Sequence, residues 1–463
     1  MSKTTIDLLY LVTIVTFILA LRFLSSPKRA RQGNLLGAAG MALAIAVTLA
    51  QEGLENYVWI AIAMAIGAVA GVVGARSVKM TAMPQMVALF NGVGGGAVSL
   101  IALAEFHNLT PLPGDLAAEE SITILLSALI GSISFSGSLI AFAKLQELLS
   151  GRPIVYVGQQ FVNGAVLLGA LVLGVLIVAG AEGDALVVAL ISAALAFGVL
   201  FVLPIGGADM PVVISLLNAF TGLAASAAGF LLHNNVLIVA GALVGASGTL
   251  LTLLMGRAMN RSIGNVLFGA FGSVQAGVAA KAGEDGRSVR STTPEDLAIM
   301  LNYARKVVFV PGYGLAVAQA QHDVRALADL LEGKGVGVLY GIHPVAGRMP
   351  GHMNVLLAEA NVPYDQLKEM DEINPELPQT DVVVILGAND VVNPAARSDP
   401  GSPIYGMPII DVDRAAHVVV VKRSLSPGFA GIDNPLFYEE KTSMLFADAK
   451  KALEDTAAAL KAL

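Results

Sequence analysis

Nine long apolar runs constrain the fold of this chain more than any other feature of its sequence. A helix needs about 20 mostly apolar residues to cross the hydrocarbon core of a bilayer. Runs of about this length lie at residues 5–24, 34–50, 55–75, 84–104, 121–143, 162–180, 185–204, 211–232 and 235–255. The first run lacks the strongly basic start and the small-residue cleavage site of a secretory signal, so we interpret it as a span. The sequence therefore predicts a multi-span α-helical membrane bundle of about nine helices.

The charged residues divide the chain into two parts. Residues 1–262 hold 11 Lys+Arg and 11 Asp+Glu, whereas residues 263–463 hold 17 Lys+Arg and 24 Asp+Glu, which is the whole net charge of −7. Only 14% of all residues are charged, against about 25% in an ordinary soluble protein. We therefore expect a transmembrane domain at 1–262, a linker at 263–293 and a water-soluble domain at 294–463.

Composition also excludes several classes of protein. The excess of acidic residues and the absence of long basic runs argue against a nucleic-acid partner. Because the chain has no cysteine, disulfides, iron–sulfur clusters and thiol catalysis are excluded for it. All six histidines fall outside the nine apolar runs, which rules out a haem held by paired histidines within the membrane. We predict no metal site.

The loops between the runs predict the orientation of the bundle. One set of loops carries ten basic residues, and the opposite set carries only Lys3. Basic residues concentrate in cytoplasmic loops, so we expect the N-terminus outside, the C-terminal domain in the cytoplasm, and a multi-pass protein of the cell inner (cytoplasmic) membrane, surrounded by lipid. The ten basic residues are Arg22, Lys28, Arg29, Arg31, Arg76, Lys79, Lys144, Arg152, Arg257 and Arg261.

Few polar residues lie within the predicted spans, and a polar group in lipid is costly enough to suggest a function. Asn91 in the fourth span and Asn218 in the eighth are amides that need hydrogen-bond partners. They indicate either a water or proton pathway or plain hydrogen bonding between helices. The glycines that follow Asn91, and the serines at 132, 134, 136 and 138, are typical of close helix packing.

The C-terminal part reads as strands alternating with helices. Buried apolar runs predict strands at 306–310, 336–341, 381–387 and 417–422, and helices are expected near 295–304, 315–333, 351–360 and 443–461. This alternation predicts a parallel sheet covered on both faces, which is a Rossmann-like α/β domain. About 170 residues are enough for one independent core.

The first predicted strand runs into Gly312-Tyr313-Gly314 and then into a helix. A strand, a Gly-x-Gly turn and a helix start form the phosphate-binding turn of dinucleotide folds. The third position of that fingerprint is Val317, where glycine or alanine is usual, so the strand and helix context supports the interpretation more than the motif does. The alternative is a tight turn without a ligand.

The other strand ends favour NADP(H) over NAD(H). An NAD site usually has Asp or Glu at the end of the second strand, but this strand ends in Tyr340-Gly-Ile-His-Pro344. Another strand ends in Val421-Lys-Arg-Ser424, which brings two cations and a hydroxyl to the edge where open α/β sheets bind ligands. Lysine and arginine together suit a phosphate monoester such as the 2′-phosphate, although an exposed basic pair is often only solvated surface.

Several long motifs resemble one family. They are Pro311-Gly-Tyr-Gly-Leu-Ala-Val-Ala-Gln-Ala-Gln321, Gly341-Ile-His-Pro-Val-Ala-Gly-Arg-Met-Pro-Gly-His-Met-Asn-Val355, Gly387-Ala-Asn-Asp390, Asn393-Pro-Ala-Ala396, Lys422-Arg-Ser424, Ile205-Gly-Gly-Ala-Asp-Met-Pro211 and Ala258-Met-Asn-Arg261. Together they resemble the beta subunit of the proton-translocating NAD(P) transhydrogenase over nearly the whole chain. The resemblance implies hydride transfer between NADH and NADP⁺ while a proton crosses the membrane. It also implies a partner alpha subunit that holds NAD(H) and further membrane helices, and a dimer of the full assembly.

The resemblance also implies roles for particular residues. Lys422, Arg423 and Ser424 would hold the 2′-phosphate, and Asp390, the catalytic candidate, would lie near the nicotinamide. The residues from Gly428 to Asn434 look like the lid of the family. The full set of implied NADP(H)-binding residues is Gly312, Tyr313, Gly314, Ala316, Val317, His343, Gly347, Arg348, Gly387, Ala388, Asn389, Asp390, Lys422, Arg423, Ser424, Gly428, Phe429 and Ala430.

Two positions depart from the family pattern. Many members carry Tyr at the position of Phe429, so a hydroxyl contact is lost there. Many members carry a membrane histidine, proposed to carry the proton, at the position of Asn91. Asparagine does not titrate, so we expect the proton to pass either by water or through an ionisable group of the partner subunit, and the sequence alone favours the partner. Asp209 and Arg261 are then the coupling candidates, or members of a structural ion pair.

Two other functions need comparison. A transporter or channel gated by an NADP(H)-sensing domain would show inverted repeats and broken helices at the membrane midplane, and the two halves of the bundle show no convincing repeat. A quinone reductase that uses NADPH would need a flavin or metal relay, for which the spans offer neither cysteine nor histidine.

Overall fold

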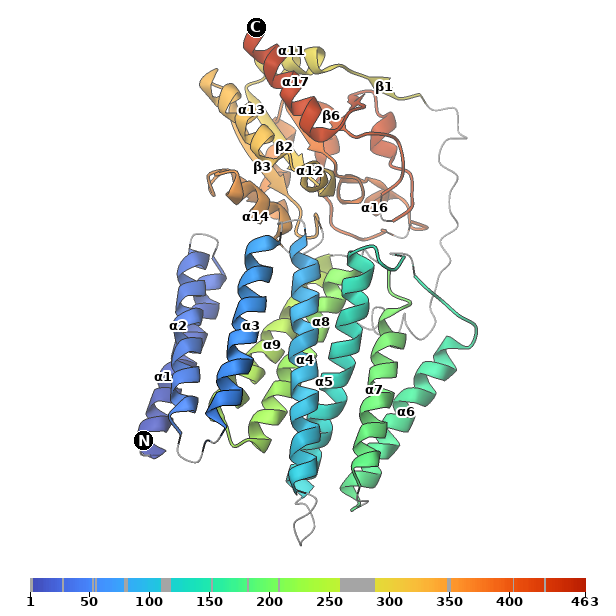
Figure 1. Cartoon of the computed structure of the whole chain (residues 1–463). Helices are drawn as coiled ribbons and strands as arrows, with labels where there is room; N and C mark the ends of the chain where they lie inside the picture. Colours follow the sequence, from blue (N-terminus) through green and yellow to red (C-terminus); the bar gives the residue numbers. More distant parts are fainter. Residues whose placement is uncertain are drawn as a thin grey trace. The chain divides into compact units, whose positions relative to one another are not determined.

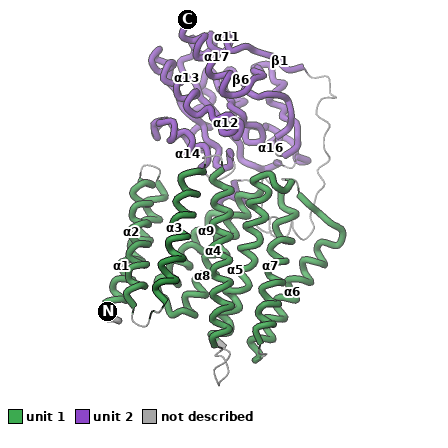
Figure 2. The backbone as a smooth tube through the Cα atoms, viewed as in Figure 1, with its two compact units in different colours: residues 1–253, 264–273 green, residues 254–263, 274–463 purple. Residues whose placement is uncertain are grey.

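The computed structural model forms two compact units. It describes residues 3–26, 29–51, 54, 56–78, 82–109, 118–150, 153–180, 183–206, 209–258, 288–347, 351–402, 404–428 and 430–463. The described residues up to Leu253 belong to the first unit, and those from Ser288 to Leu463 belong to the second (Figure 2). Most of the expected linker, together with Arg261, Arg348 and Phe429, lies outside the described residues.

The first unit contains nine helices that are long and apolar enough to cross a membrane, counted over the described residues. The nine predicted spans are therefore confirmed, including the short run at 34–50, which lies within a helix of 20 residues. The helices are α1 Lys3–Leu24, α2 Ala30–Leu49, α3 Tyr57–Ser77, α4 Met83–Leu109, α5 Ala118–Leu145, α6 Gln159–Val178, α7 Asp184–Val202, α8 Met210–Leu231 and α9 Asn235–Ala258 (Figure 1).

Glycine contacts hold the central helices of this unit close together. A Cβ atom added to Gly95 of α4 would lie 2.8 Å from the carbonyl oxygen of Gly131 on α5, and one added to Gly131 would lie 2.7 Å from that of Gly95. Gly222 of α8 meets Gly241 and Gly245 of α9 in the same way, with backbone atoms 2.6 to 2.8 Å from an added Cβ. Small residues let helices approach closely in lipid, so these contacts account for the glycines of α4, α5, α8 and α9 named here.

The second unit contains one parallel sheet of seven strands within the part of the chain that is described. Its order is β1-β7-β6-β5-β2-β3-β4, and all six neighbouring pairs are parallel. The predicted parallel sheet is thus confirmed, with three strands more than the sequence indicated. The strands are β1 Arg290–Ser291, β2 Lys306–Pro311, β3 Gly337–Ile342, β4 Leu367–Glu369, β5 Val382–Leu386, β6 His417–Val421 and β7 Thr442–Leu445.

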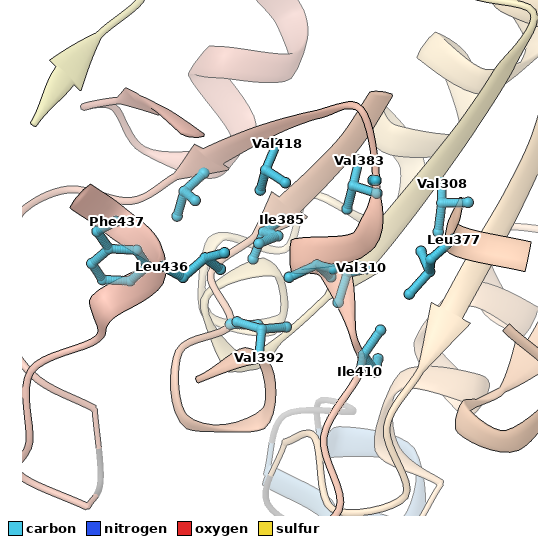
Figure 3. Close-up of a cluster of buried hydrophobic side chains, with 14 of the residues drawn as sticks. Val308, Val310, Leu377, Val383, Ile385, Val392, Ile410, Val418, Leu436 and Phe437 are labelled. Atoms are coloured by element: carbon cyan, nitrogen blue, oxygen red, sulfur yellow. The ribbon is translucent and has the colours of Figure 1, made fainter. Parts of the chain in front are cut away.

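The helices of the second unit cover a sheet whose central strands are buried on both faces. Every residue of β5 is buried, as expected for a parallel strand between two helical layers. Figure 3 shows the buried cluster on one side of the sheet, in which Val308, Val383 and Val418 pack with Leu436 and Phe437. The helices are α11 Pro294–Tyr303, α12 Tyr313–Ala318, α13 Gln321–Gly333, α14 His352–Glu359, α15 Met370–Ile373, α16 Ala395–Ser398 and α17 Ala449–Ala462.

Two predicted helices differ in their bounds. The helix expected at 315–333 is broken after Ala318, because Gln319 takes a left-handed conformation with φ +53° and a new helix begins at Gln321. The helix expected at 443–461 begins only at Ala449, since residues 442–445 form the buried strand β7.

The order of the strands places a topological switch point beside β2. From β2 the chain continues to β3 and β4 on one side, and then returns to β5, β6 and β7 on the other side. In open α/β sheets, ligands bind outside the carboxyl ends of the strands at such a point. The loops that follow β2 and β5 are therefore the expected centre of a site.

Candidate functional site

The predicted site residues lie at one edge of the sheet. Because the strands are parallel, their carboxyl ends meet at the same edge, in the order β6, β5, β2, β3. The loops that follow these strands begin at Lys422, Gly387, Gly312 and His343 respectively. The structure therefore brings together loops that are more than 100 residues apart in sequence.

Three glycines let the loops after β2 and β5 touch through their backbones. A Cβ atom on Gly312 would lie 2.4 Å from Ala388 Cα, and a Cβ atom on Gly314 would lie 2.6 Å from Gly387 Cα. Gly387 has φ +67°, and its own added Cβ would lie 2.3 Å from Gly314 Cα. Side chains at these positions would force the two loops apart.

The N–H groups of two of these glycines are already engaged. Gly312 N donates to Leu386 O at 2.9 Å, and Gly314 N donates to Gly387 O at 3.0 Å. These N–H groups thus join the two loops, which differs from the anion-binding role that the motif suggested. Next to them Ala316 is fully buried, whereas Val317 is 50% exposed and is the member of the fingerprint that can contact a ligand.

Asp390 anchors the loop that follows β6. It begins a short 3₁₀ helix after β5, and its Oδ2 accepts a hydrogen bond from Ala430 N at 3.0 Å. A Cβ atom on Gly428 would lie 2.4 Å from Asp390 Oδ1, so a glycine is needed where the loop crosses the carboxylate. With its side-chain amide turned, Asn389 accepts from Gly428 N at 2.7 Å and from Lys422 Nζ at 3.1 Å.

The two predicted cations differ in their environment. Lys422 is half-buried: its ammonium donates to Ser426 O and lies 5.2 Å from the centre of the Phe437 ring. Burial lowers the pKa of Lys422, while the carboxylates of Asp390 and Asp433 oppose that shift. Arg423 is exposed and free to reach a phosphate.

Ser424 belongs to the same exposed edge. Its hydroxyl donates to Ser426 Oγ at 2.9 Å, and Ser426 N donates back to Ser424 Oγ at 3.4 Å. The turn after β6 therefore presents Arg423 and Ser424 to solvent and directs Lys422 toward the loop after β5.

Two buried asparagines hold the far end of this loop, and sequence reasoning placed them in family motifs without predicting this role. Asn393 Nδ2 donates to Asp433 O at 3.0 Å, and Asn434 Nδ2 donates to Asn389 O at 3.2 Å. The signal that points to them is the Asn-Pro pair at 393–394 and again at 434–435, since asparagine before proline favours a turn that its side chain stabilises.

His343 and Gly347 lie at the end of β3, away from the exposed surface. The His343 ring is 1% exposed, its Nε2 lies 2.8 Å from Pro408 O, and its Nδ1 accepts from Val345 N at 3.2 Å. Gly347 has φ +107°, and an added Cβ would lie 2.4 Å from Nδ1 of the buried His352. Both positions shape the β3 loop from within, and direct contact of either with a dinucleotide stays a prediction.

The buried His343 predicts that acid destabilises the second unit. Burial lowers its pKa, and the hydrogen bond to Pro408 O opposes the shift. The unfolded chain, with a histidine pKa of about 6.5, therefore binds more protons than the folded chain as the pH falls below that value. We expect a loss of stability of at most about 1.4 kcal/mol per pH unit in this range.

Protease resistance of the second unit on heating, measured from pH 7.5 to 5.5 in the full chain, tests this expectation. His343→Asn should flatten the pH dependence, whereas His322→Gln on the exposed face of α13 should leave it unchanged. An unchanged slope in His343→Asn would show that another group causes it.

In the membrane unit, Asn91 lies in a polar cluster formed by three helices. It is 8% exposed, and its Nδ2 donates to Ser138 Oγ at 2.9 Å and to Ser134 Oγ at 3.3 Å, both on α5. Ser134 in turn donates to Leu217 O of α8 at 2.9 Å and contacts Thr221. Asn91 Oδ1 is buried and accepts no hydrogen bond from the described residues.

The other described membrane candidates both lie on α8. Asn218 is partly buried on α8, and Asp209 occupies the N-cap position of the same helix. Helix packing by Ser132 is borne out by its 2.7 Å contact with Ser99 Oγ. Over the residues that the structure describes, no group of three or more His, Cys, Asp or Glu side chains is arranged to hold a metal ion.

Comparison with known proteins shows which family this chain is similar to. The family model for the NAD(P) transhydrogenase beta subunit matches residues 6–459. Two curated proteins from Rhodospirillum rubrum, each named NAD(P) transhydrogenase subunit beta, are 51% identical to this chain over 456 residues. The match covers 97% of this chain and 98% of each relative.

Proposed function

This chain belongs to the family of NAD(P) transhydrogenase beta subunits, a membrane enzyme of the proton-translocating class, and from that premise we propose what its two units do. The C-terminal unit binds NADP(H) and exchanges hydride with NAD(H) held by a partner alpha subunit. The membrane unit moves a proton in step with this transfer. The domain division that we propose is the one predicted from the sequence, with 1–262 in the membrane, 263–293 as linker and 294–463 for the nucleotide.

The residues at the sheet edge fit NADP(H). The loops after β2 and β5 meet through the backbones of glycines, so no glycine side chain projects from their junction. A dinucleotide could therefore lie close to the backbone there. Arg423 and Ser424, exposed at the end of β6, supply a cation and a hydroxyl for a 2′-phosphate. The end of β3 carries no carboxylate of the kind that takes the ribose 2′-hydroxyl in NAD sites and would repel this phosphate.

The nicotinamide of the bound nucleotide supplies the hydride chemistry. The protein needs no acid or base at the reacting carbon, so its contribution is positioning and exclusion of water. Asp390 contributes by holding Ala430 and Gly428 beside the loop after β5, through its hydrogen bond from Ala430 N and its close approach to Gly428. We therefore assign Asp390 to lid closure near the reacting end.

The observation that carries this proposal is the meeting of Lys422, Asn389, Asp390 and Gly428 at the switch point. Calorimetry on the full chain in detergent tests it, with NADPH and NADH as ligands. Tight NADPH binding and weak NADH binding, followed by hydride transfer when the alpha subunit and NADH are added, are the expected results. Binding of NADPH without hydride transfer would favour the gated transporter instead.

For the proton, we propose that water passes Asn91. The buried Oδ1 of Asn91 is an acceptor that the described side chains leave unused, and a buried amide oxygen is costly without a donor. Hydrogen-bonding side chains extend from Asn91 toward α8, namely Ser138, Ser134 and Thr221. Asn218, Asp209 and Arg261 are the remaining candidates on this route and at its cytoplasmic end.

We expect Asn91→Leu to slow proton transport about fivefold or more, a barrier higher by roughly 1 kcal/mol, without changing NADPH affinity. A pH-sensitive dye inside vesicles that hold both subunits measures the transport. Asn163→Leu is the matched control, because Asn163 is a fully buried amide on α6 that bonds Tyr156 instead. Equal losses in both variants would contradict a water route at Asn91.

The same proposal includes the membrane, the orientation and the oligomeric state of the enzyme. The chain lies in the cell inner membrane with its N-terminus outside and its nucleotide unit in the cytoplasm, and two copies of the full assembly form a dimer. One charge that falls through 100 mV supplies about 2.3 kcal/mol. At about 1.4 kcal/mol per factor of ten, this shifts the NADPH/NADP⁺ ratio by roughly 40-fold, which is enough to set the direction of hydride transfer.

A further inference from the structure

Lys144 is a buried cation that the proposed function has not used. It lies at the end of α5 and is 2% exposed. Among the described residues of the membrane unit, no other charged side chain is buried. A buried ammonium is costly and is retained where it has a specific partner or task.

The partners of Lys144 are main-chain carbonyl groups of a neighbouring helix end. Its ammonium donates to Leu203 O, and to Ile205 O at 2.7 Å. Leu203 is the C-cap residue of α7. The last carbonyls of a helix have no partner within the helix and carry partial negative charge, so Lys144 both satisfies them and balances their charge.

A second side chain ties the same helix ends together. Gln85, 7% exposed near the start of α4, donates through Nε2 to Leu145 O at 3.1 Å. Leu145 is the last residue of α5 and directly follows Lys144. The ends of α4, α5 and α7 are therefore joined by two buried side chains that bind backbone oxygens.

The contacts of Lys144 and Gln85 lie between two parts of the proposed proton route, the Asn91 cluster and Asp209. Ten residues before Lys144, α5 carries Ser134, which contacts Asn91 and α8. On the other side, the carbonyl of Ile205 is four residues before Asp209, the N-cap residue of α8. Lys144 therefore links α5, which carries part of the Asn91 cluster, to the carbonyls of Leu203 and Ile205 at and after the end of α7.

We propose that Lys144 is a positioning residue for coupling: it holds Leu203 and Ile205, which lead from α7 toward Asp209, against α5, so that the position of Asp209 follows the state of the membrane helices. This inference rests on the proposed proton-coupled function. It predicts that loss of the ammonium leaves nucleotide binding intact and makes hydride transfer independent of proton movement.

The test compares Lys144→Met with the wild type in vesicles that hold both subunits. We expect Lys144→Met to lower the number of protons moved per hydride transferred by at least about fivefold, with NADPH affinity within twofold of wild type. If both rates fall in the same proportion, Lys144 has only a structural role. Where Lys144→Met does not accumulate, Lys144→Gln, which keeps an N–H donor, is judged by the same criteria.

A labelling experiment tests the positioning claim without proton transport. Because the chain has no cysteine, Gly206→Cys places a single thiol in the α7–α8 connection, where an added Cβ would meet nothing closer than 3.6 Å. In the purified assembly, Lys144→Met should raise the rate of maleimide labelling of this thiol severalfold. Ser25→Cys, after α1, should react at an unchanged rate.

The outcomes separate the two proposals. Unchanged labelling at position 206 would overturn the role of Lys144 even if transport is impaired. A wild-type assembly that binds NADPH but moves no protons would overturn the proposed coupling, and faster labelling in Lys144→Met would still show that Lys144 positions this connection.

Discussion

Replacing Lys422 and Arg423 together by alanine should reduce NADPH affinity by at least about 100-fold, since each hydrogen bond to a charged group contributes about 1.5–3 kcal/mol. Both residues follow β6 at the edge of the sheet where we propose that the nucleotide binds. NADH lacks the 2′-phosphate and should lose far less affinity. Calorimetry with both nucleotides on the full chain measures the ratio of the two losses.

The single variants should behave differently, because Lys422 is half-buried and bonds to described parts of the chain, whereas Arg423 is exposed. Lys422 binds Ser426 O and lies beside Asn389, so Lys422→Ala should loosen the loop and weaken both nucleotides to some degree. Arg423 is exposed, so Arg423→Ala should weaken NADPH alone. The comparison separates direct recognition of the phosphate from support of the loop.

A second basic pair in the same unit provides the control. Lys450 and Lys451 lie in the first turn of α17, where Lys450 faces Glu454 at 3.9 Å. Alanine at both positions removes the same charge from the unit and should change NADPH affinity less than threefold, because surface charges act weakly at a distance in salt. A loss at this pair that matches the loss at 422–423 would mean that net charge, and not a site, governs binding.

The parts of this structure that could be predicted follow from local patterns. Lipid imposes a length on each span, so nine helices could be counted from apolar runs. Strands buried on both faces are unbroken valine and isoleucine runs, which is why β2, β5 and β6 were found within a residue of their bounds. The strands β1, β4 and β7 have two to four residues, which is too few to show a period.

The contacts within the site could not be predicted, because they join residues far apart in sequence. Nothing in Gly341-Ile-His343 indicates that Pro408, 65 residues later, buries the imidazole. The bond between Ala430 and Asp390 likewise spans 40 residues. The motif predicted a glycine turn after β2, but only the fold shows that Gly312 N–H donates to Leu386 O, at the end of β5, and Gly314 N–H to Gly387 O.

The contact between Gly314 and Gly387 leads to the second prediction with a large expected effect. In Gly387→Ala, the new Cβ would lie 2.3 Å from Gly314 Cα, in a residue with φ +67°. Overpacking costs about 1–3 kcal/mol and the left-handed conformation about 1–2 kcal/mol more. We therefore expect a clear fall in the melting temperature of the full chain and a loss of NADPH affinity of about tenfold or more.

Gly314→Ala tests the same contact from the other side, since its Cβ would lie 2.6 Å from Gly387 Cα. If one contact causes both effects, the first substitution already separates the loops, and the double variant should lose less than the sum of the single losses. Gly333→Ala is the matched control: it ends α13 with nothing within 4 Å of an added Cβ, so alanine should be neutral or stabilising by up to about 1 kcal/mol. Additive losses at 314 and 387 would mean that the two glycines act separately, and that the junction of the β2 and β5 loops is not the floor of the nucleotide site.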